Sequence, residues 1–532
     1  MGMNLTLLRY GDEYLIVDCG VQFPEEPLLG IDHMLVNMDA LREIDGRVAG
    51  IILTHGHEDH IGAVRWIAPL FDAPVYGTAF TIGLVEKRLL ETGILEQCEL
   101  RTFTPADTLN LGPFRIEFLR VTHSLPDCVS VIIHTDTGTV VHSGDFKIDE
   151  TPLDKQHFDH AGFERIGTAG VDLLLSDSTN AMVPGQTLSE KTVADNLMKT
   201  ISDWQGRVIV CMFASNLYRM ASLFKIAKKT GRRICLVGRS FGSYLAISHG
   251  CVDLDLPKPE DMIDPDELES YAGRDVLVLS TGSQAEPFSA LARASQGRHR
   301  NLKVDDDDLI IFSSRRIPGN ERKVQELMNN LDRLGATCLE GHRTGMHASG
   351  HARQEELKTM LQLVRPKHFI PIHGEYAFLK AHAELAKTCG VPDVRIVENG
   401  AVMSLSAGSL VQIAEVDATP FMREANRLTI IQDPGVRERR NMACNGVASV
   451  VILRKSNSPY HRGTIRISTA GLVPDGKPAL AKVEKAIREE LEASPSGIKK
   501  DKVVETVQRT VRRFYKNTSG KRPLVLVTLE EI

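Results

Sequence analysis

The stretch Thr54-His55-Gly56-His57-Glu58-Asp59-His60 decides how this chain is interpreted. It follows the apolar run 48–53, which predicts a buried strand, and precedes residues 61–67, which predict a helix. Five potential ligands, three histidines and two acids, therefore project from six positions of one strand-to-helix turn. Imidazole nitrogen and carboxylate oxygen are ligands that suit zinc. The alternative, a polar surface loop that contains histidine by chance, is disfavoured by this density of ligands.

The spacing within the stretch indicates two ion sites. His55 and His57 are two residues apart and can point to the same side of an extended backbone. Asp59 and His60 come one turn later, where they could serve a second ion.

The pattern His-x-His-x-Asp-His resembles the signature of the metallo-β-lactamase superfamily. This resemblance implies three further ligands, each at the end of a later strand, and the sequence supplies His123, Asp145 and His373 in the family's order. It also implies how the ligands divide between two zinc ions. One ion would be held by His55, His57 and His123, the other by Asp59, His60 and His373, with Asp145 bridging them. Mn²⁺ or Mg²⁺ could take the place of zinc.

Length and composition set broad limits on the protein class. A chain of 532 residues predicts two to four domains, and 42% hydrophobic with 25% charged residues is ordinary for a globular protein. The net charge of −6 gives no sign of global nucleic-acid binding, although a local basic groove would suffice. None of the nine cysteines forms a Cys-x-x-Cys pair. With no signal peptide and no 18-residue apolar run, we expect a cytoplasmic protein without a membrane span.

Alternating apolar and helical segments predict two α/β sheets in succession. Residues 48–185 indicate one layered domain, and the repeated strand–helix rhythm from 190 to 344 indicates a separate parallel sheet. Ligands of such sheets bind at the carboxyl ends of strands. Hydroxyl, amide and guanidinium groups that suit phosphate occur at those ends, so we expect substrate contacts from Ser215, Asn216, Arg239 and Ser240. Each turn taken alone would be interpreted simply as a turn.

The segment 345–352, Gly-Met-His-Ala-Ser-Gly-His-Ala, resembles a motif of the β-CASP ribonucleases, a branch of the same superfamily. Asp177 and His373-Gly374-Glu375 match that branch's other motifs. Within the branch, the segments 54–62, 176–181, 213–216 and 371–376 and the chain's ending are similar to the ribonuclease J family, and the similarity covers nearly the whole chain.

This resemblance implies an α/β fold: a metallo-β-lactamase αββα sandwich with an inserted β-CASP α/β domain and a small α+β C-terminal domain. The boundaries that we expect are 1–189 and 345–418 for the metallo-β-lactamase domain, 190–344 for the insert, 419–434 for a linker and 435–532 for the C-terminal domain. The C-terminal domain is tied to self-association in that family, so we expect a homodimer or homotetramer. The Lys/Arg-rich stretch 499–522 could contact RNA, but a solvated helix face is the simpler interpretation.

The resemblance also implies an activity and roles for residues. We expect metal-dependent hydrolysis of RNA that leaves a 5′-phosphate, with combined 5′-to-3′ exonuclease and endonuclease activity, in RNA decay and in rRNA and mRNA maturation. Asp177 and His351 would protonate the leaving oxygen, and Asp59 would have a catalytic as well as a ligand role. The preferred substrate would be single-stranded RNA with a 5′-monophosphate, held by His347, Ala348, Ser349, Gly350 and His351.

Two other classes of function stay open. A small-ester or lactam hydrolase could use the same core, but an inserted domain of about 155 residues (190–344) is unnecessary for a small substrate. A catalytically inactive RNA-binding scaffold would be expected to lack a metal ligand, whereas all seven are present here.

Overall fold

The structure, a computed structural model, describes residues 2–24, 30–317, 319–406, 408–425, 427–430, 433–472, 477–495 and 497–532. The chain divides into two compact units, one containing residues 1–23 and 35–419 and the other residues 24–34 and 420–532. No helix in the described part of the chain combines the length and the apolar character that a membrane span would need.

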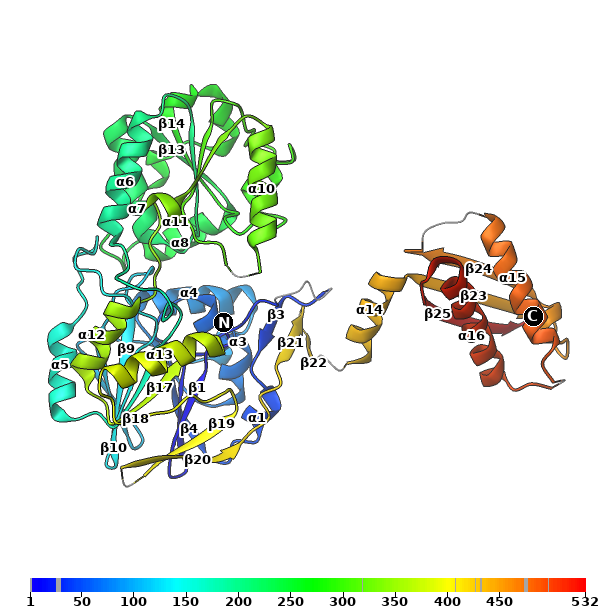
Figure 1. Cartoon of the computed structure of the whole chain (residues 1–532), viewed down its shortest axis with the longest axis horizontal. Helices are drawn as coiled ribbons and strands as arrows, with labels where there is room; N and C mark the ends of the chain where they lie inside the picture. The colour runs from blue at the N-terminus through cyan, green and yellow to red at the C-terminus, as the bar shows by residue number, and fades with distance from the viewer. Residues whose placement is uncertain are drawn as a thin grey trace. The chain divides into compact units, whose positions relative to one another are not determined.

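The first unit is built on two sheets that share a core (Figure 1). The first sheet has the order β1-β2-β4-β5-β6, with β1 antiparallel to β2 and the other neighbours parallel. Its strands are β1 (Thr6–Tyr10), β2 (Glu13–Val17), β4 (Arg47–Ile52), β5 (Val75–Gly77) and β6 (Leu100–Thr102). Residues 48–52 of β4 are buried, as expected for a parallel strand covered on both faces.

The second sheet has the order β18-β17-β11-β10-β9-β8-β7. Its strands are β7 (Thr108–Leu111), β8 (Phe114–Arg120), β9 (Val129–Thr135), β10 (Gly138–His142), β11 (Leu173–Asp177), β17 (His368–Ile372) and β18 (Asp393–Val394). Leu15 and Ile52 of the first sheet pack in one cluster with Ile116 and Val131 of the second. The two sheets therefore lie face to face, and the hairpin β19 (Ala401–Ser406) and β20 (Ser409–Glu415) follows β18 in the chain.

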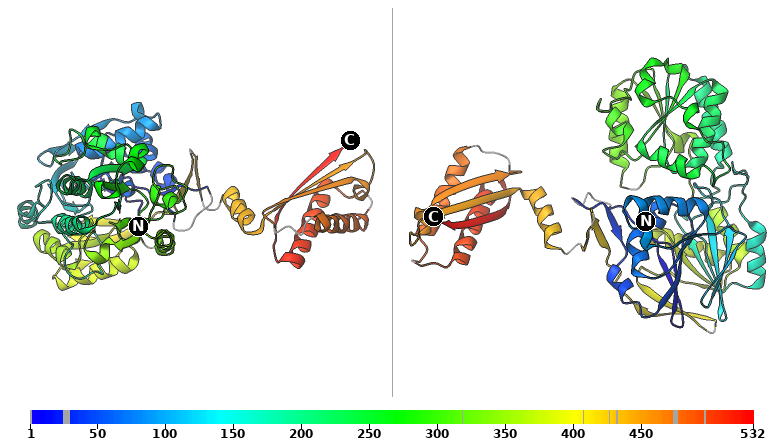
Figure 2. Two further views of the ribbon diagram at one scale, coloured as in Figure 1. Left: turned by 90° about the horizontal axis from the view of Figure 1, so that it is seen from above. Right: turned by 180° about the vertical axis from the view of Figure 1, so that it is seen from behind.

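Helices cover the outer faces of this pair of sheets (Figures 1 and 2). They are α1 (Met38–Arg42), α2 (Glu58–Ile61), α3 (Val64–Ile67), α4 (Ala79–Glu91), α5 (His160–Ala169), α12 (Gln354–Val364) and α13 (Tyr376–Thr388). The predicted helix 61–67 is in fact divided, because α2 ends at Ile61 and α3 starts at Val64. Short 3-10 helices connect other elements: η1 (Ala68–Leu70), η2 (Leu95–Gln97), η3 (Pro259–Asp261), η4 (Pro265–Ser270), η5 (Gly273–Asp275) and η6 (Tyr460–Arg462).

A separate parallel sheet lies between β11 and β17 in the chain, as the strand–helix rhythm predicts. Its order is β13-β14-β12-β15-β16, so the chain winds to both sides of β12. The strands are β12 (Val208–Cys211), β13 (Arg233–Val237), β14 (Val276–Ser280), β15 (Leu309–Phe312) and β16 (Thr337–Glu340). The helices are α6 (Glu190–Asp203), α7 (Leu217–Thr230), α8 (Arg239–Ser248), α9 (Ala290–Ala294), α10 (Glu321–Arg333) and α11 (Gly341–Thr344).

A buried ionic network joins the inserted sheet to the two-sheet core. The Arg219 guanidinium of α7 is fully buried and pairs with Glu190 at 2.9 Å. It also contacts Ser313 after β15 and donates to the Met346 carbonyl at 3.2 Å, where the chain returns to the core. Buried Lys147 lies 3.2 Å from Asp149 and 3.7 Å from Glu190. Each buried charge has a partner of opposite sign, and the network contacts the returning chain at Met346.

The second unit contains two small sheets. β21 (Phe421–Glu424) and β22 (Arg427–Ile430) form a hairpin, and β21 is flanked by β3 (His33–Leu35). The segment 419–434, predicted to be a linker, therefore contains strands, in which Phe421, Met422, Leu428 and Ile430 are interspersed among polar residues. Residues 24–34, predicted to belong to the first domain, cluster with this unit.

The C-terminal sheet has the order β24-β23-β25 and follows α14 (Pro434–Asn445). Its strands are β23 (Val447–Arg454), β24 (Thr464–Ala470) and β25 (Leu524–Glu531). Two helices, α15 (Lys477–Glu492) and α16 (Lys500–Ser519), pack against it through a core that includes Val450, Ile487 and Val507. These strands and helices make up a small α+β domain, as the sequence predicts for residues 435–532.

Candidate metal centre

The seven predicted metal ligands meet at one edge of the paired sheets. His55 and His57 follow β4, and Asp59 and His60 lie on α2. The other three follow β8, β10 and β17, as His123, Asp145 and His373. β10, β11 and β17 are parallel neighbours, so the residues after them emerge side by side.

Four donors form the first group: His55, His57, His123 and Asp145. The His57 Nδ1 atom lies 3.0 Å from Nε2 of His55 and 3.1 Å from Nε2 of His123. The Asp145 Oδ2 atom lies 3.7 Å from His55 Nε2. Two imidazoles on one tetrahedral zinc, at about 2.0–2.1 Å each, would have nitrogens about 3.4 Å apart. The donor set and its spacing therefore fit a single divalent cation.

The second group contains Asp59, His60, His373 and again Asp145. His60 Nε2 is 3.2 Å from Asp145 Oδ2 and 3.7 Å from Asp59 Oδ2. His373 Nε2 is 3.2 Å from Asp59 Oδ2. Asp145 belongs to both groups and is almost completely buried, so its carboxylate lies where it would be shared.

The protonation of the first group suits metal binding. Burial lowers the pKa of His57 to about 4, and burial also holds the pKa values of His55 and His123 well below the usual range. These imidazoles are therefore neutral near pH 7, as a metal ligand must be. In the second group, burial is opposed by the carboxylates around His373, chiefly Asp145, and its pKa rises to about 10. That imidazolium balances a concentration of negative charge that a bound cation would also neutralise.

The histidines are held by hydrogen bonds on their other ring nitrogens. His60 Nδ1 donates to Asp18 at 2.8 Å, and His123 Nδ1 donates to the Gly350 carbonyl at 2.6 Å. The His55 Nδ1 atom lies 3.1 Å from the hydroxyl of Thr54, which itself donates to Asp18. Such outer contacts fix the tautomer and orientation of a ligating ring.

Asp18 is the main residue of the centre that the sequence interpretation missed. It is buried and accepts hydrogen bonds from the Thr54 backbone N–H at 2.8 Å and from His60. Its backbone is left-handed, with φ of 65°, and His373 shares that conformation with φ of 53°. Strained conformations of this kind persist where the surroundings require them. The signal in the sequence was an acid directly after an apolar strand, in Val17-Asp18.

Asp177 and His351 lie beside both groups of donors. His351 Nδ1 donates to Asp177 Oδ2 at 2.8 Å and lies 3.8 Å from Asp145 Oδ2. Burial lowers the pKa of His351, but Asp177 and Asp145 raise it by more, so the net shift is upward. The Thr179 hydroxyl donates to Asp177 Oδ1 at 2.7 Å. With Nδ1 committed to Asp177, the other ring nitrogen of His351 is the one available for proton transfer.

The turn 347–350 adjoins this pair, but its residues differ in what they contact. Ser349 Oγ accepts from Asn180 Nδ2 at 2.9 Å and from the His351 backbone N–H at 3.2 Å, which leaves its own hydrogen free to donate. Nδ1 of His347 is buried without a hydrogen-bond partner among the described residues. Ala348 is buried, and the Gly350 carbonyl is used by His123.

The predicted substrate residues of the inserted sheet do not all reach the centre. The Asn216 side chain caps α7, accepting from the Arg219 backbone N–H at 3.0 Å, and Ser215 beside it is half-buried. Arg239 and Ser240 are exposed at the start of α8 and make no hydrogen bond or ion pair with the donor residues, all of which the structure describes. The reason is that β13, which precedes them, is an edge strand, whereas β12 and β15 are central.

Asn180 and Arg315 were not among the predicted site residues. Asn180 Nδ2 donates to Ser349 and to the His351 carbonyl at 3.0 Å, while its Oδ1 accepts from Arg315 at 3.1 Å. Arg315 follows β15, so this chain of contacts connects the inserted sheet with the turn at 347–351. Both residues lie in polar segments after strands, a signal that does not distinguish them from their neighbours.

Comparison with protein families accounts for most of the chain. Residues 3–165 match the model of the metallo-beta-lactamase superfamily, and residues 205–331 match "Ribonuclease J, beta-CASP domain". Residues 342–396 match "Zn-dependent metallo-hydrolase RNA specificity domain", and residues 434–532 match "Ribonuclease J C-terminal domain". The fold class predicted from the sequence is thereby confirmed.

Curated relatives match over the same length. The chain is 35% identical to ribonuclease J of Sinorhizobium meliloti, with 100% of this chain and 95% of the relative covered. It is 34% identical to ribonuclease J of Thermus thermophilus, covering 100% and 93%, and 38% identical to that of Synechocystis, covering 85% and 70%. A solved structure from Enterococcus faecalis, a protein of unknown function, matches with a TM-score of 0.54 and 16% identity over 77% of this chain and 97% of that one, which shows a shared fold.

Proposed function

The chain belongs to the ribonuclease J family and is a metal-dependent ribonuclease, and we propose that it degrades single-stranded RNA from 5′-monophosphate ends with a two-zinc centre. Combined 5′-to-3′ exonuclease and endonuclease activity, in RNA decay and in rRNA and mRNA maturation, fits this family. The observation that carries the proposal is Asp145, which belongs to both groups of donors while His351 and Asp177 lie beside it.

Seven residues would hold the ions. His55, His57 and His123 would bind one, Asp59, His60 and His373 the other, and Asp145 would be shared. Mixed imidazole and carboxylate donors favour zinc, with Mn²⁺ as a substitute. Two bound cations would activate water and compensate the charge of the phosphodiester. Asp59 would contribute to this chemistry as a ligand of the second ion, beside His373, whose Nε2 lies 3.2 Å away.

His351 is proposed to donate the proton that the leaving oxygen needs. Its Nδ1 is bonded to Asp177, which fixes the ring and favours the imidazolium form. The carboxylate of Asp177 is itself oriented by Thr179, whose backbone N–H donates to it at 2.9 Å. General acid catalysis by a histidine that an acid holds in place typically accelerates the reaction by about 10²–10⁴-fold.

The turn His347-Ala348-Ser349-Gly350 is proposed to hold the terminal phosphate of the RNA. The Ser349 hydroxyl hydrogen is available to a charged oxygen. The buried Nδ1 of His347 has no hydrogen-bond partner among the described residues, and burial holds the pKa of this imidazole well below its usual range. A pocket closed around a monophosphate would admit a triphosphate poorly, because two more charged groups must be housed. A 5′-hydroxyl would leave the donors unpaired, at about 1–3 kcal/mol for a buried group.

We also propose a cytoplasmic location and self-association into a homodimer or homotetramer through the C-terminal domain. The match of residues 434–532 to the ribonuclease J C-terminal model supports the second of these.

The decisive experiment is digestion of end-labelled RNA that carries a 5′-monophosphate, a 5′-triphosphate or a 5′-hydroxyl. We expect processive 5′-to-3′ degradation of the first, slower attack on the hydroxyl end and resistance of the triphosphate. Ser349→Ala should weaken this ranking while internal cuts continue. The matched control is Ser222→Ala, whose buried hydroxyl has no hydrogen-bond partner among the described residues. Equal exonucleolytic rates on all three ends would refute the pocket.

A further inference from the structure

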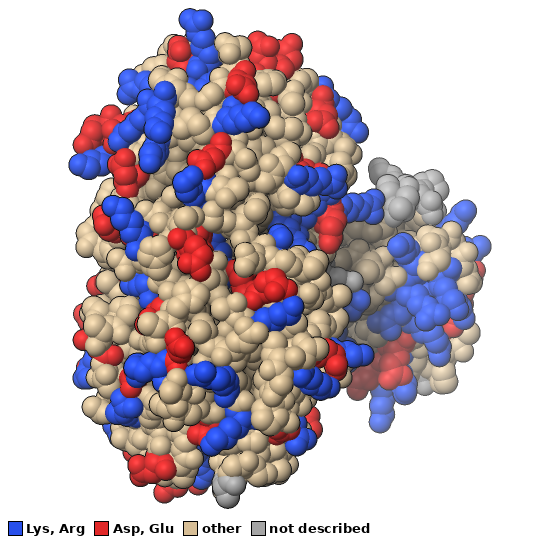
Figure 3. All heavy atoms as spheres, turned by 60° about the vertical axis from the view of Figure 1, so that its left-hand side comes forward, with Lys and Arg blue, Asp and Glu red and all other residues tan. Residues whose placement is uncertain are grey.

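Helix α16 and the turn after it carry a concentration of positive charge that the metal centre does not use. Between residues 506 and 529 there are six cations and no acid, in a chain whose net charge is −6. The cations are Arg509, Arg512, Arg513, Lys516, Lys521 and Arg522. In the space-filling view, acidic and basic side chains are interspersed over the first unit, whereas Lys and Arg gather densely on the C-terminal unit (Figure 3).

Packing of the helix fixes which of its faces is exposed. Val503, Val507, Val511 and Tyr515 recur at helical spacing and are buried in the C-terminal core. The cations occupy the opposite positions and are exposed. Because the apolar positions determine the orientation of the helix, the basic face is a fixed feature of this domain.

The side chains of three of the cations have no partner among the described residues. Arg513 is ion-paired with Glu490 of α15, and Arg509 lies 4.0 Å from the same carboxylate. The side chains of Arg512, Lys516 and Arg522 make no hydrogen bond or ion pair with any residue that the structure describes. Unpaired neighbouring charges of like sign repel one another, and a bound anion removes that repulsion.

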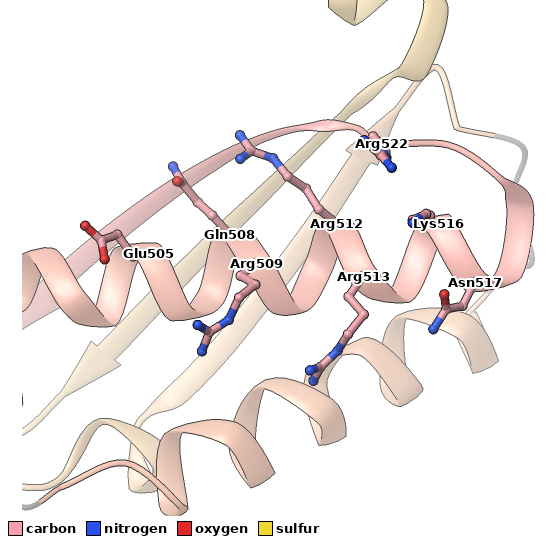
Figure 4. Close-up of a pocket in the computed structure, with 8 residues that line it drawn as sticks. All are labelled: Glu505, Gln508, Arg509, Arg512, Arg513, Lys516, Asn517 and Arg522. Carbon is pink, nitrogen blue, oxygen red and sulfur yellow. The ribbon is translucent and has the colours of Figure 1, made fainter.

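These three residues surround a hollow in the surface. It has a volume of about 620 Å³ and is lined by Glu505, Gln508, Arg509, Arg512, Arg513, Lys516, Asn517 and Arg522. In the close-up, Arg512 and Lys516 rise from one side of α16, on the side where Arg522 lies, and Gln508 continues the same row (Figure 4). From Gln508 to Lys516 the helix rises about 12 Å, so the row can face several consecutive charged groups.

We propose that this basic surface, defined by Arg512, Lys516 and Arg522, binds the phosphodiester backbone of RNA. The proposal rests on the ribonuclease function, since it gives this enzyme a second contact with its own substrate. Guanidinium groups match phosphate oxygens with two parallel hydrogen bonds. The lining contains no aromatic or aliphatic side chain, so it offers neither a stacking platform for bases nor an apolar anchor for a protein or a membrane. Binding should therefore be independent of sequence.

The test compares two triple variants of the full-length, metal-loaded protein. Arg512→Gln, Lys516→Gln and Arg522→Gln together remove the surface. The control, Lys455→Gln, Lys482→Gln and Lys500→Gln, removes the same charge from exposed positions of the same domain, whose side chains pair with no described residue. Fluorescence anisotropy with a labelled, cleavage-resistant phosphorothioate RNA of about 30 nucleotides gives the affinity at several salt concentrations. Cleavage of unmodified RNA gives KM and kcat.

We expect the surface variant to bind roughly tenfold more weakly and its loss to lie in KM rather than kcat. The slope of log affinity against log salt should fall by about 2, since each lost phosphate contact contributes about 0.7 for a single strand. The control variant should behave like the unmodified protein. Equal affinity and slope in both variants would overturn the proposal.

Other occupants of the surface give distinct results. Loss of self-association in the surface variant alone, measured by light scattering, would show instead that the surface contacts another copy. Binding of polyglutamate, or of phosphatidylserine vesicles, as tight as that of RNA would overturn the assignment to nucleic acid. An unmodified protein that fails to cleave RNA would refute the ribonuclease function itself, whereas normal cleavage with no effect of the triple variant refutes only this surface.

Discussion

Replacing Gly350 by alanine should weaken metal binding although none of the ligands is replaced. The glycine approaches the His123 ring so closely that an added Cβ would lie 2.5 Å from Cε1 and 2.7 Å from Nδ1. Carbon atoms prefer about 3.5–4.0 Å, so the ring must move by about 1 Å or the turn must retreat. Either movement disturbs the 2.6 Å hydrogen bond between His123 Nδ1 and the Gly350 carbonyl.

The size of this effect on metal affinity follows from the role of the hydrogen bond between His123 and the Gly350 carbonyl. Loss of an outer hydrogen bond to a ligating histidine typically costs 10–100-fold in metal affinity, or about 1.4–2.7 kcal/mol. We expect Gly350→Ala to lower the affinity for one of the two zinc ions by this factor, measured in a competition titration against a fluorescent chelator. Gly242→Ala is the matched control, because its Cβ would meet no atom within 4 Å. If Gly350→Ala kept the affinity of the unmodified protein, His123 would not be a ligand and the donor assignment would be wrong.

Three further predictions address the shared ligand, the acid and the core. Asp145→Ala should lower the metal content from two ions per chain to less than one, by elemental analysis, because both groups of donors use it. His351→Ala should keep both ions while cleavage slows by about 10²–10⁴; loss of metal would make it a ligand instead. Burial lowers the pKa of His382 to about 3, whereas the unfolded value is about 6.5. Between these two pH values only the unfolded chain takes up the proton, so the free energy of unfolding decreases as the pH is lowered. His382→Phe should therefore reduce the stability lost between pH 7 and pH 5 by about 2 kcal/mol in urea unfolding; an unchanged loss would show that another group titrates.

The elements of the fold were predictable because each has a local signature. Val48 to Leu53 is a continuous apolar run, and a run of that length is a buried strand in a parallel sheet. The spacing of Val503, Val507 and Val511 predicts the amphipathic helix α16. The strands at 421–430 escaped prediction, because a short hairpin between charged residues has the composition of a linker.

What the sequence determined about the centre was the identity of its ionisable groups, and what the tertiary structure decided was their partners. His55 and His57 are two residues apart in the sequence, so their joint role follows from spacing alone. Asp18, Asn180 and Gly350 become part of the centre only when strand ends far apart in the chain are brought together by the sheets. Arg239 shows the converse: it follows a strand, but that strand, β13, lies at the edge of its sheet, so Arg239 does not reach the metal centre. Chemistry is carried by residue type, whereas proximity is set by strand order, which no local pattern encodes.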